Sequence, residues 1–180
     1  MTTQDTRRIS LYVHVPFCET KCPYCDFNTY ARIEWLMPSY IKAVVREIRL
    51  WGRLLARPTV HTVFLGGGTP SYLPSEDIEK IMAAVRVDFV LEGNAEITME
   101  ANPGDFDARK LESYLAAGVN RLSIGVQSFD DGLLQKLGRR HSAKGAGDAY
   151  RMAIDAGFDN VSIDLMYGLP YQDAGQWEST

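Results

Sequence analysis

Short apolar segments alternate along the chain with longer amphipathic ones, and this alternation restricts the fold more than any other feature of the sequence. The short segments are rich in β-branched residues and are bounded by Gly, Pro or Asn, which is typical of strands. They are Leu11–Phe17, His61–Leu65, Glu96–Glu100, Arg121–Gln127 and Asn160–Met166. Strands that alternate with helices predict an α/β fold with a parallel sheet, because each helix returns the chain to the same end of the sheet for the next strand.

The segments between the strands carry signals for helices. The first predicted helix is Pro38–Leu55, and its apolar face comprises Ile41, Val44, Val45, Ile48 and Trp51. The second helix is expected to start with Ser75 as its N-cap, a position that favours a hydroxyl side chain. Two further helices are expected to end at Gly118 and Gly157, because glycine is favoured where the chain turns left-handed after a helix.

A short internal repeat narrows the fold class. Residues 117–124 (AGVNRLSI) resemble residues 156–163 (AGFDNVSI), one helix and one strand later. Such a repeat favours a partial (β/α) barrel over an open doubly wound sheet. The visible strand–helix units number about five, which is too few to close a barrel of eight. We therefore expect residues 1–180 to be one domain, the N-terminal part of a barrel truncated at its C-terminus, with the remaining strands and a C-terminal domain absent.

Charge and cysteine content exclude several classes of protein. The formal net charge of −4 offers no basic surface for nucleic acid, and no apolar run is long enough to span a membrane. Residues 1–10 are polar and lack the apolar core of a secretory signal. The cysteines are few, odd in number and clustered, which indicates metal or redox chemistry in a reducing compartment rather than disulfides. We expect a cytoplasmic protein that binds no nucleic acid and has no membrane span.

The cysteine motif itself suggests a metal centre. Cys18, Cys22 and Cys25 form a C-x3-C-x2-C motif directly after the first predicted strand. Three thiolates at this spacing leave a four-iron cluster with one iron open to an exogenous ligand. The alternative is a structural zinc site in which His14 completes a Cys3His set. The cysteines by themselves leave both alternatives open.

The residues at the ends of the other strands distinguish these alternatives. In parallel α/β folds the reactive groups lie at the carboxyl ends of the strands, and here those positions hold the glycine-rich turn 66–70 (GGGTP), Glu100, Gln127 and Asp164. No Lys-Ser/Thr pair follows the glycines, so the turn is not a phosphate-binding P-loop. Its bare backbone would let a small ligand approach closely. A zinc ribbon requires none of these features. Arg139 lies in a basic segment, residues 138–141 (GRRH), and taken alone it is explained by a solvated turn.

Together these motifs resemble the radical S-adenosylmethionine (SAM) superfamily, in which C-x3-C-x2-C is followed by a glycine-rich turn after the next strand. More narrowly, five segments are similar to the oxygen-independent coproporphyrinogen III oxidase-like family, which includes the HemN and HemW types. These segments are Tyr12–Cys18, Cys25–Phe27, Phe64–Pro70, Gly125–Phe129 and Asp164–Pro170. The resemblance covers nearly the whole chain but only about the N-terminal half of a typical member, so it implies the N-terminal part of a radical SAM core domain.

The resemblance also implies cofactors and the residues that hold them. A [4Fe–4S] cluster would be ligated by Cys18, Cys22 and Cys25. The amino and carboxylate groups of SAM would chelate the fourth iron, and contacts to this SAM match Tyr12, Gly67 and Glu100. Contacts to a second SAM match Tyr24, Gly68, Thr69, Gln127, Arg139 and Asp164. An electron from the reduced cluster would then break the sulfonium bond and give a 5′-deoxyadenosyl radical.

One position separates two functions within this family. The decarboxylating oxidase is associated with a fourth cysteine two residues after the third, where this sequence has Phe27. The chain thus resembles the haem-chaperone (HemW) branch, whose members bind haem and transfer it to acceptor proteins, and whose proposed haem-binding segment lies beyond residue 180.

We keep two alternatives to a haem chaperone. The first is an oxygen-independent coproporphyrinogen III oxidase, which converts propionates of a porphyrinogen to vinyls by SAM-dependent decarboxylation in porphyrin biosynthesis. The second is a zinc-stabilised module without a redox role. In the chaperone and the oxidase alike, the partners implied are SAM, haem or a porphyrinogen, and an electron donor such as a flavodoxin; the chaperone adds a haem-acceptor protein.

Overall fold

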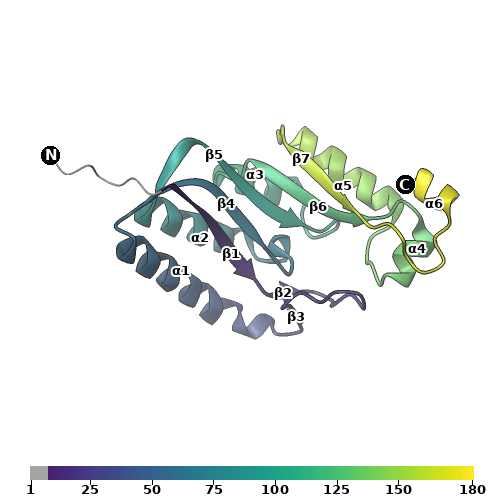
Figure 1. Cartoon of the computed structure of the whole chain (residues 1–180), viewed down its shortest axis with the longest axis horizontal. Coiled ribbons are helices and arrows are strands. Elements are labelled where there is room, and N and C mark those ends of the chain that lie inside the picture. The colour runs from purple at the N-terminus through teal and green to yellow at the C-terminus, as the bar shows by residue number, and fades with distance from the viewer. Residues whose placement is uncertain (1–7) are drawn as a thin grey trace.

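The computed structural model describes residues 8–180, which fold into a parallel sheet with helices against one face (Figure 1). The polar N-terminal segment considered above lies outside the described residues as far as residue 7. All neighbouring strands of the sheet are parallel, in the order β1-β4-β5-β6-β7. These strands are β1 (Arg8–Val15), β4 (Thr59–Gly67), β5 (Val90–Ala101), β6 (Arg121–Gln127) and β7 (Val161–Leu165). The predicted partial (β/α) barrel is confirmed.

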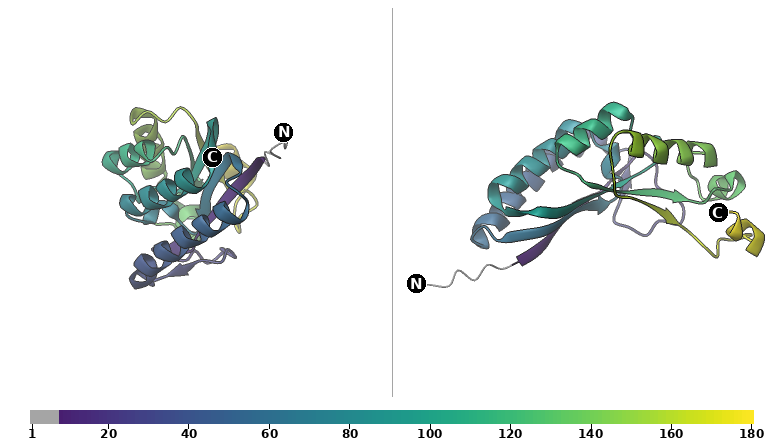
Figure 2. Two further views of the ribbon diagram at one scale, coloured as in Figure 1. Left: turned by 90° about the vertical axis from the view of Figure 1, so that its left-hand side faces the viewer. Right: turned by 90° about the horizontal axis from the view of Figure 1, so that it is seen from above.

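The long helices follow the strands in turn and lie together on one side of the sheet (Figure 2). The long ones are α1 (Met37–Leu54), α2 (Ser75–Asp88), α3 (Ala108–Ala116) and α5 (Ala143–Asp155). The short elements are β2 (Phe17–Cys18), β3 (Tyr30–Ala31), η1 (Glu34–Leu36), η2 (Pro70–Tyr72), α4 (Asp131–Lys136) and α6 (Ala174–Glu178). None of the helices described in residues 8–180 has the length and apolar character needed to cross a membrane.

The two faces of the sheet differ in chemistry because successive side chains along a strand point to opposite sides. The helix-covered face is apolar and buried, with Val13, Val15, Val63, Leu65, Ile97, Met99, Leu122 and Ile124 in the core. The opposite face is polar, and along β5 and β6 it presents Glu96, Glu100, Arg121 and Ser123. Parallel sheets are usually covered on both faces by apolar contacts, so this polar face is the one that would line the interior of a barrel.

Helix boundaries follow the sequence signals with two corrections. Gly118 and Gly157 end α3 and α5 with φ angles of 88° and 103°, as predicted. Ser75 is wrong as an N-cap: it is the first residue of α2, and Pro74 holds the cap position, with φ −55° and ψ 141°. Trp51 is wrong as a core residue, since it is 49% exposed. Four residues after the buried Ile48, the position that faces α2 is instead taken by Gly52.

Gly52 allows α1 to pack closely against the end of α2. A β-carbon at this position would lie 2.5 Å from the carbonyl oxygen of Asp88 and 2.6 Å from its Cβ. We expect Gly52→Ala to lower the free energy of unfolding by about 1–3 kcal/mol through overpacking, although alanine favours helices more than glycine. Urea unfolding followed by circular dichroism measures the change.

Gly147 in α5 supplies the matched control. The nearest atom to a β-carbon there is the mobile end of Arg151, at 3.7 Å. Gly147→Ala should therefore raise the free energy of unfolding by about 0.5–1 kcal/mol, the ordinary helix-propensity gain. If both variants were stabilised equally, the close contact between α1 and α2 would be wrong.

Candidate functional site

A pocket of about 160 Å³ opens at the carboxyl edge of the sheet. Its wall is built from the loop that carries the cysteines, the glycine-rich turn after β4, and the ends of β5, β6 and β7. The sequence-predicted residues that line it are Cys18, Cys22, Tyr24, Cys25, Gly67, Gly68, Thr69, Glu100, Gln127, Arg139 and Asp164. Residues spread over most of the chain are thus brought to one cavity.

The three cysteines are half-buried free thiols with different neighbours. The Thr69 hydroxyl donates to Cys18 Sγ at 3.4 Å, and Arg139 Nη1 donates to Cys22 Sγ at 3.5 Å. Burial raises the pKa of the Cys18 thiol. Within residues 8–180, no three His, Cys, Asp or Glu side chains converge on a point where one metal ion could sit. Ligands of a four-iron cluster bind different iron atoms and need no such point, and the ligand role of the thiols stays a prediction.

His14 does not complete a zinc site with these thiols. Its Nδ1 pairs with the Tyr12 hydroxyl at 2.9 Å, and its Nε2 pairs with the carbonyl oxygen of Asn28 at 2.8 Å. Both ring nitrogens are therefore engaged, and the fourth ligand of the Cys3His alternative is missing.

Tyr12 stands apart from the other predicted site residues. It is 60% exposed on β1, with its ring stacked near that of Phe64 at a centroid distance of 6.1 Å, and it is not part of the pocket wall. Its hydroxyl orients His14, whose ring in turn lies against Gly67. A role for Tyr12 in binding stays a prediction.

The glycine-rich turn brings the end of β4 against the cysteine-bearing segment. A β-carbon on Gly68 would lie 2.7 Å from the carbonyl oxygen of Phe17 and 2.8 Å from that of Val15. Gly67 has a φ of 115°, in the left-handed region that favours glycine. Gly68 therefore allows close packing of backbone on backbone, whereas Gly67 leaves room for the His14 ring, and both leave their own backbone on the pocket wall.

Glu100 supplies a carboxylate near the glycine-rich turn. It lies half-buried on the polar face of β5 and accepts the Gly67 N–H at 2.8 Å. Burial raises the pKa of Glu100, and the hydrogen bond from Gly67 only partly offsets that effect. Such a carboxylate is favoured in its charged form by an added cationic group.

Gln127 and Asp164 close the far side of the pocket. Gln127 has a φ of 72° at the end of β6, a conformation that non-glycine residues seldom adopt and that is often found at functional sites. The pairing of β6 with β7 shifts register between Gly125 and Gln127. Asp164 is exposed and accepts the Ser123 hydroxyl at 3.0 Å.

Arg139 belongs to the pocket wall rather than to a solvated turn. Its guanidinium donates to the side chain of Asn102, to the Gly125 carbonyl oxygen at 2.5 Å and to the Tyr24 hydroxyl at 3.4 Å, besides Cys22. Burial raises the pKa of Tyr24 to about 12 against the opposing effect of Arg139. A fixed positive charge therefore stands beside the thiols.

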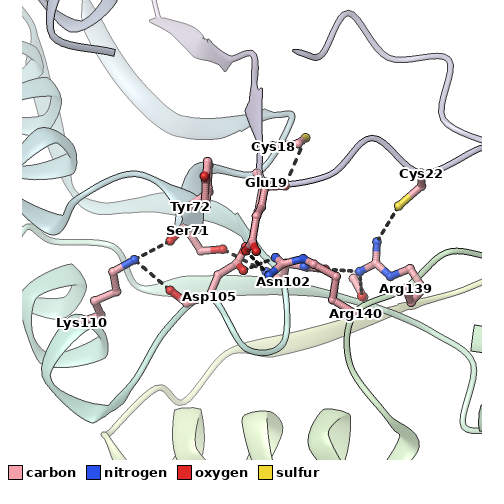
Figure 3. A network of polar contacts seen from close by, with 12 residues as sticks. Cys18, Glu19, Cys22, Ser71, Tyr72, Asn102, Asp105, Lys110, Arg139 and Arg140 are labelled. Carbon is pink, nitrogen blue, oxygen red and sulfur yellow. Dashed lines mark hydrogen bonds and ion pairs between the residues drawn. The ribbon is translucent and has the colours of Figure 1, made fainter. Parts of the chain in front are cut away.

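Sequence reasoning missed a set of charged residues next to the pocket (Figure 3). Arg140 forms ion pairs with Glu19 of the cysteine loop and with Asp105 after β5. Lys110 donates to the carbonyl oxygens of Asp105 and Ser71, both at 2.8 Å. These partners come from loops far apart in the sequence, so no local pattern signals them.

Comparisons with known proteins agree with this geometry. The family model of the Radical SAM superfamily matches residues 12–180. The haem chaperone HemW of Bacillus subtilis is 43% identical over 91% of this chain and 43% of its own length. That of Escherichia coli is 42% identical over 91% of this chain and 44% of its own.

A solved structure gives the same relationship in three dimensions. Coproporphyrinogen III oxidase (HemN) from Escherichia coli, a radical SAM enzyme, superposes with a TM-score of 0.88 at 34% identity, over 95% of this chain and 40% of that one. The chain therefore spans less than half the length of the relatives it matches. By its family match, its relatives and its fold, the chain belongs to the radical SAM superfamily, in the HemN-like branch that contains the HemW proteins.

Proposed function

We propose that this chain is the cluster- and SAM-binding part of a haem chaperone of the HemW type, with residues 1–180 as the N-terminal part of its radical SAM core domain. The observation that carries this is one pocket lined by all three thiols, the glycine-rich turn and Glu100. Membership of the superfamily implies a [4Fe–4S] cluster and SAM. When bound, this pair supplies reductive cleavage of the sulfonium bond.

The donor set of the pocket suits an iron–sulfur cluster. Cys18, Cys22 and Cys25 are soft thiol ligands, and each is partly open to the cavity. Hydrogen bonds from Thr69 and Arg139 to two of these sulfurs would remain available to stabilise the thiolate forms and to tune the potential of the centre.

The remaining wall suits a zwitterionic nucleoside ligand. The Glu100 carboxylate would accept a hydrogen bond from the amino group of SAM, and the backbone of Gly67 would lie beside that amino group. A second SAM would be contacted by six other residues of the wall: Tyr24, Gly68, Thr69, Gln127, Arg139 and Asp164. Tyr12, on the polar face of β1, would contact SAM only at the rim of the pocket.

Phe27 favours the chaperone over the oxidase. It stands where the decarboxylating oxidases are expected to have a further cysteine, and both HemW relatives are over 40% identical. The oxidase remains the second candidate because HemN shares the fold at a TM-score of 0.88. Haem, a flavodoxin-like electron donor and a haem acceptor are the partners we propose. Clustered free cysteines favour a reducing compartment such as the cytoplasm.

Removing one thiol tests the cluster site. We expect Cys22→Ala to abolish assembly of the cluster while leaving the fold intact, because Cys22 is half-buried in a loop outside the core. Iron content and electron paramagnetic resonance after anaerobic reconstitution measure assembly, and circular dichroism measures the fold. Thr20→Ala, in the same loop, is the control. Full iron content in Cys22→Ala would remove Cys22 from the ligand set.

Replacing the pocket carboxylate tests the SAM site. Glu100→Gln should weaken SAM binding about tenfold, the loss expected for one hydrogen bond to a charged group. The control is Glu96→Gln, on the same face of the same strand but paired with Arg121 and outside the pocket wall. Titration of the reduced cluster with SAM, followed by electron paramagnetic resonance, gives both affinities.

The pH dependence of SAM binding provides a second test of this carboxylate. Because burial raises the pKa of Glu100, protonation removes its charge at a higher pH than for an ordinary glutamate. SAM affinity should therefore fall as the pH is lowered, and Glu100→Gln should lose this dependence. An unchanged pH profile in that variant would assign the effect to another group.

Decarboxylation and haem binding separate the two candidate functions. The protein that carries this chain at the full length of its HemW relatives should bind haem and should yield no protoporphyrinogen from coproporphyrinogen, with reductant and SAM under strict anaerobiosis. An authentic HemN in the same assay shows that the conditions support turnover. Conversion by the protein itself would overturn the chaperone assignment in favour of the oxidase.

A further inference from the structure

We propose that Arg140 is a positioning residue that fastens the cysteine loop, residues 18–25, to the interior of the protein. Its guanidinium bridges two carboxylates, Glu19 through Nη1 and Asp105 through Nη2. Glu19 directly follows Cys18, so the bridge acts within one residue of a thiol. We call Arg140, Glu19 and Asp105 the clasp. Its relevance to a cluster rests on the function proposed above.

The two ends of the clasp differ in burial. The Asp105 side chain is 2% exposed, whereas that of Glu19 is 47% exposed. Burial raises the pKa of Asp105, and the Arg140 guanidinium opposes this effect. A buried carboxylate that loses its cation is strongly destabilised, so Arg140 is held firmly by Asp105. Glu19 is then the releasable end, and the cysteine loop is attached through it.

The buried end is itself tied to the scaffold (Figure 3). Lys110 of α3 donates to the carbonyl oxygens of Asp105 and Ser71, each at 2.8 Å. Ser71 of η2 is fully buried, and its hydroxyl accepts the backbone N–H of Asn102 at 3.0 Å. The clasp therefore connects the cysteine loop to the segments that follow both β4 and β5.

The cysteine loop needs such attachment because it has few apolar contacts of its own. Glu19, Thr20, Lys21 and Pro23 are exposed, and segments of this kind open at low free-energy cost. Arg139 holds the middle of the loop through Cys22 and Tyr24. Arg140 holds the beginning through Glu19. Two consecutive arginines thus fasten the loop at separate points, and within residues 8–180 the side-chain hydrogen bonds of Arg140 go to carboxylates rather than to a thiol.

Hydrogen exchange of the cluster-free protein tests the clasp directly. In Glu19→Gln, amides in a peptide covering residues 18–25 should exchange roughly 1.5-fold to fivefold faster, the range expected for loss of a partly exposed ion pair. Peptides from α1 and α2 should be unchanged. This variant keeps the Arg140–Asp105 pair, so it leaves no buried carboxylate without its cation. Arg151→Gln, which breaks a comparable Arg–Asp pair on α5, is the control.

Further variants establish that Arg140 acts through Glu19. Glu19→Gln combined with Arg140→Gln should accelerate exchange of the loop no more than Arg140→Gln does alone. Arg140→Lys, with a point charge that cannot bridge both carboxylates, should restore protection only in part. Exchange of the 18–25 peptide at the parent rate in both Glu19→Gln and Arg140→Gln would overturn the clasp.

The reconstituted protein supplies a readout that a purely structural role would not move. Release of iron to a chelator should be roughly 1.5-fold to fivefold faster in Glu19→Gln, with an unchanged midpoint of thermal unfolding. Equal rates of release in parent and variant would overturn positioning of the cluster ligands. If the parent assembles no cluster, the proposed function fails, whereas hydrogen exchange still decides whether the clasp exists.

Discussion

Parallel pairing of five strands is the constraint on which the rest of this structure depends. Because β1, β4, β5, β6 and β7 all run in one direction, their carboxyl ends meet at one edge. The register places Val15 opposite Gly67 and Leu65 opposite Met99. That register brings the Gly67 N–H within 2.8 Å of the Glu100 carboxylate, although the two residues are separated by a helix in the sequence. The pocket is a consequence of this alignment.

The same pairing gives the two faces of the sheet different roles, one in stability and one in the chemistry of the site. Apolar side chains such as Leu122 and Ile124 pack against the helices and are buried. Burial of apolar surface is the main source of stability in any such fold. The alternate positions are thereby free to be polar, and Ser123, Gln127 and Glu100 occupy them without weakening the core. Chemistry and stability are thus assigned to opposite sides of one layer.

Features that depend on local sequence could be predicted, and features that depend on distant partners could not. The limits of β6, Arg121 and Gln127, and the terminal glycines Gly118 and Gly157 are local, and the structure has them as expected. The first predicted strand ends too late, since β1 stops at Val15 and Phe17 begins the short strand β2. Trp51 was misplaced because one residue of helical phase separates it from the buried Gly52. Arg140 has partners 121 and 35 residues away along the chain. Only the folded arrangement of the loops reveals its role.

The start of β5 shows why the first residue of a strand is harder to predict than its last residue. The Gly93-Asn94 pair indicates a boundary, yet β5 begins at Val90 and pairs with Thr59 and Val60 before an irregularity in register. The chain thus accommodates turn-forming residues inside a strand, at the point where the pairing with β4 shifts register. The carboxyl end, where the functional residues lie, has no such irregularity between β4 and β5.

Charge balance at the carboxyl edge connects the fold to the ligand it suits. Three thiols, Glu100 and Asp164 gather in one cavity, and groups that become negative together disfavour each other's charged forms. Arg139 and Arg140 lie on the same wall and offset this repulsion on the side of the cysteine loop. Glu100 lies across the cavity, on the glycine side, where burial raises its pKa. An added cation is favoured there, and SAM carries both an ammonium and a sulfonium group.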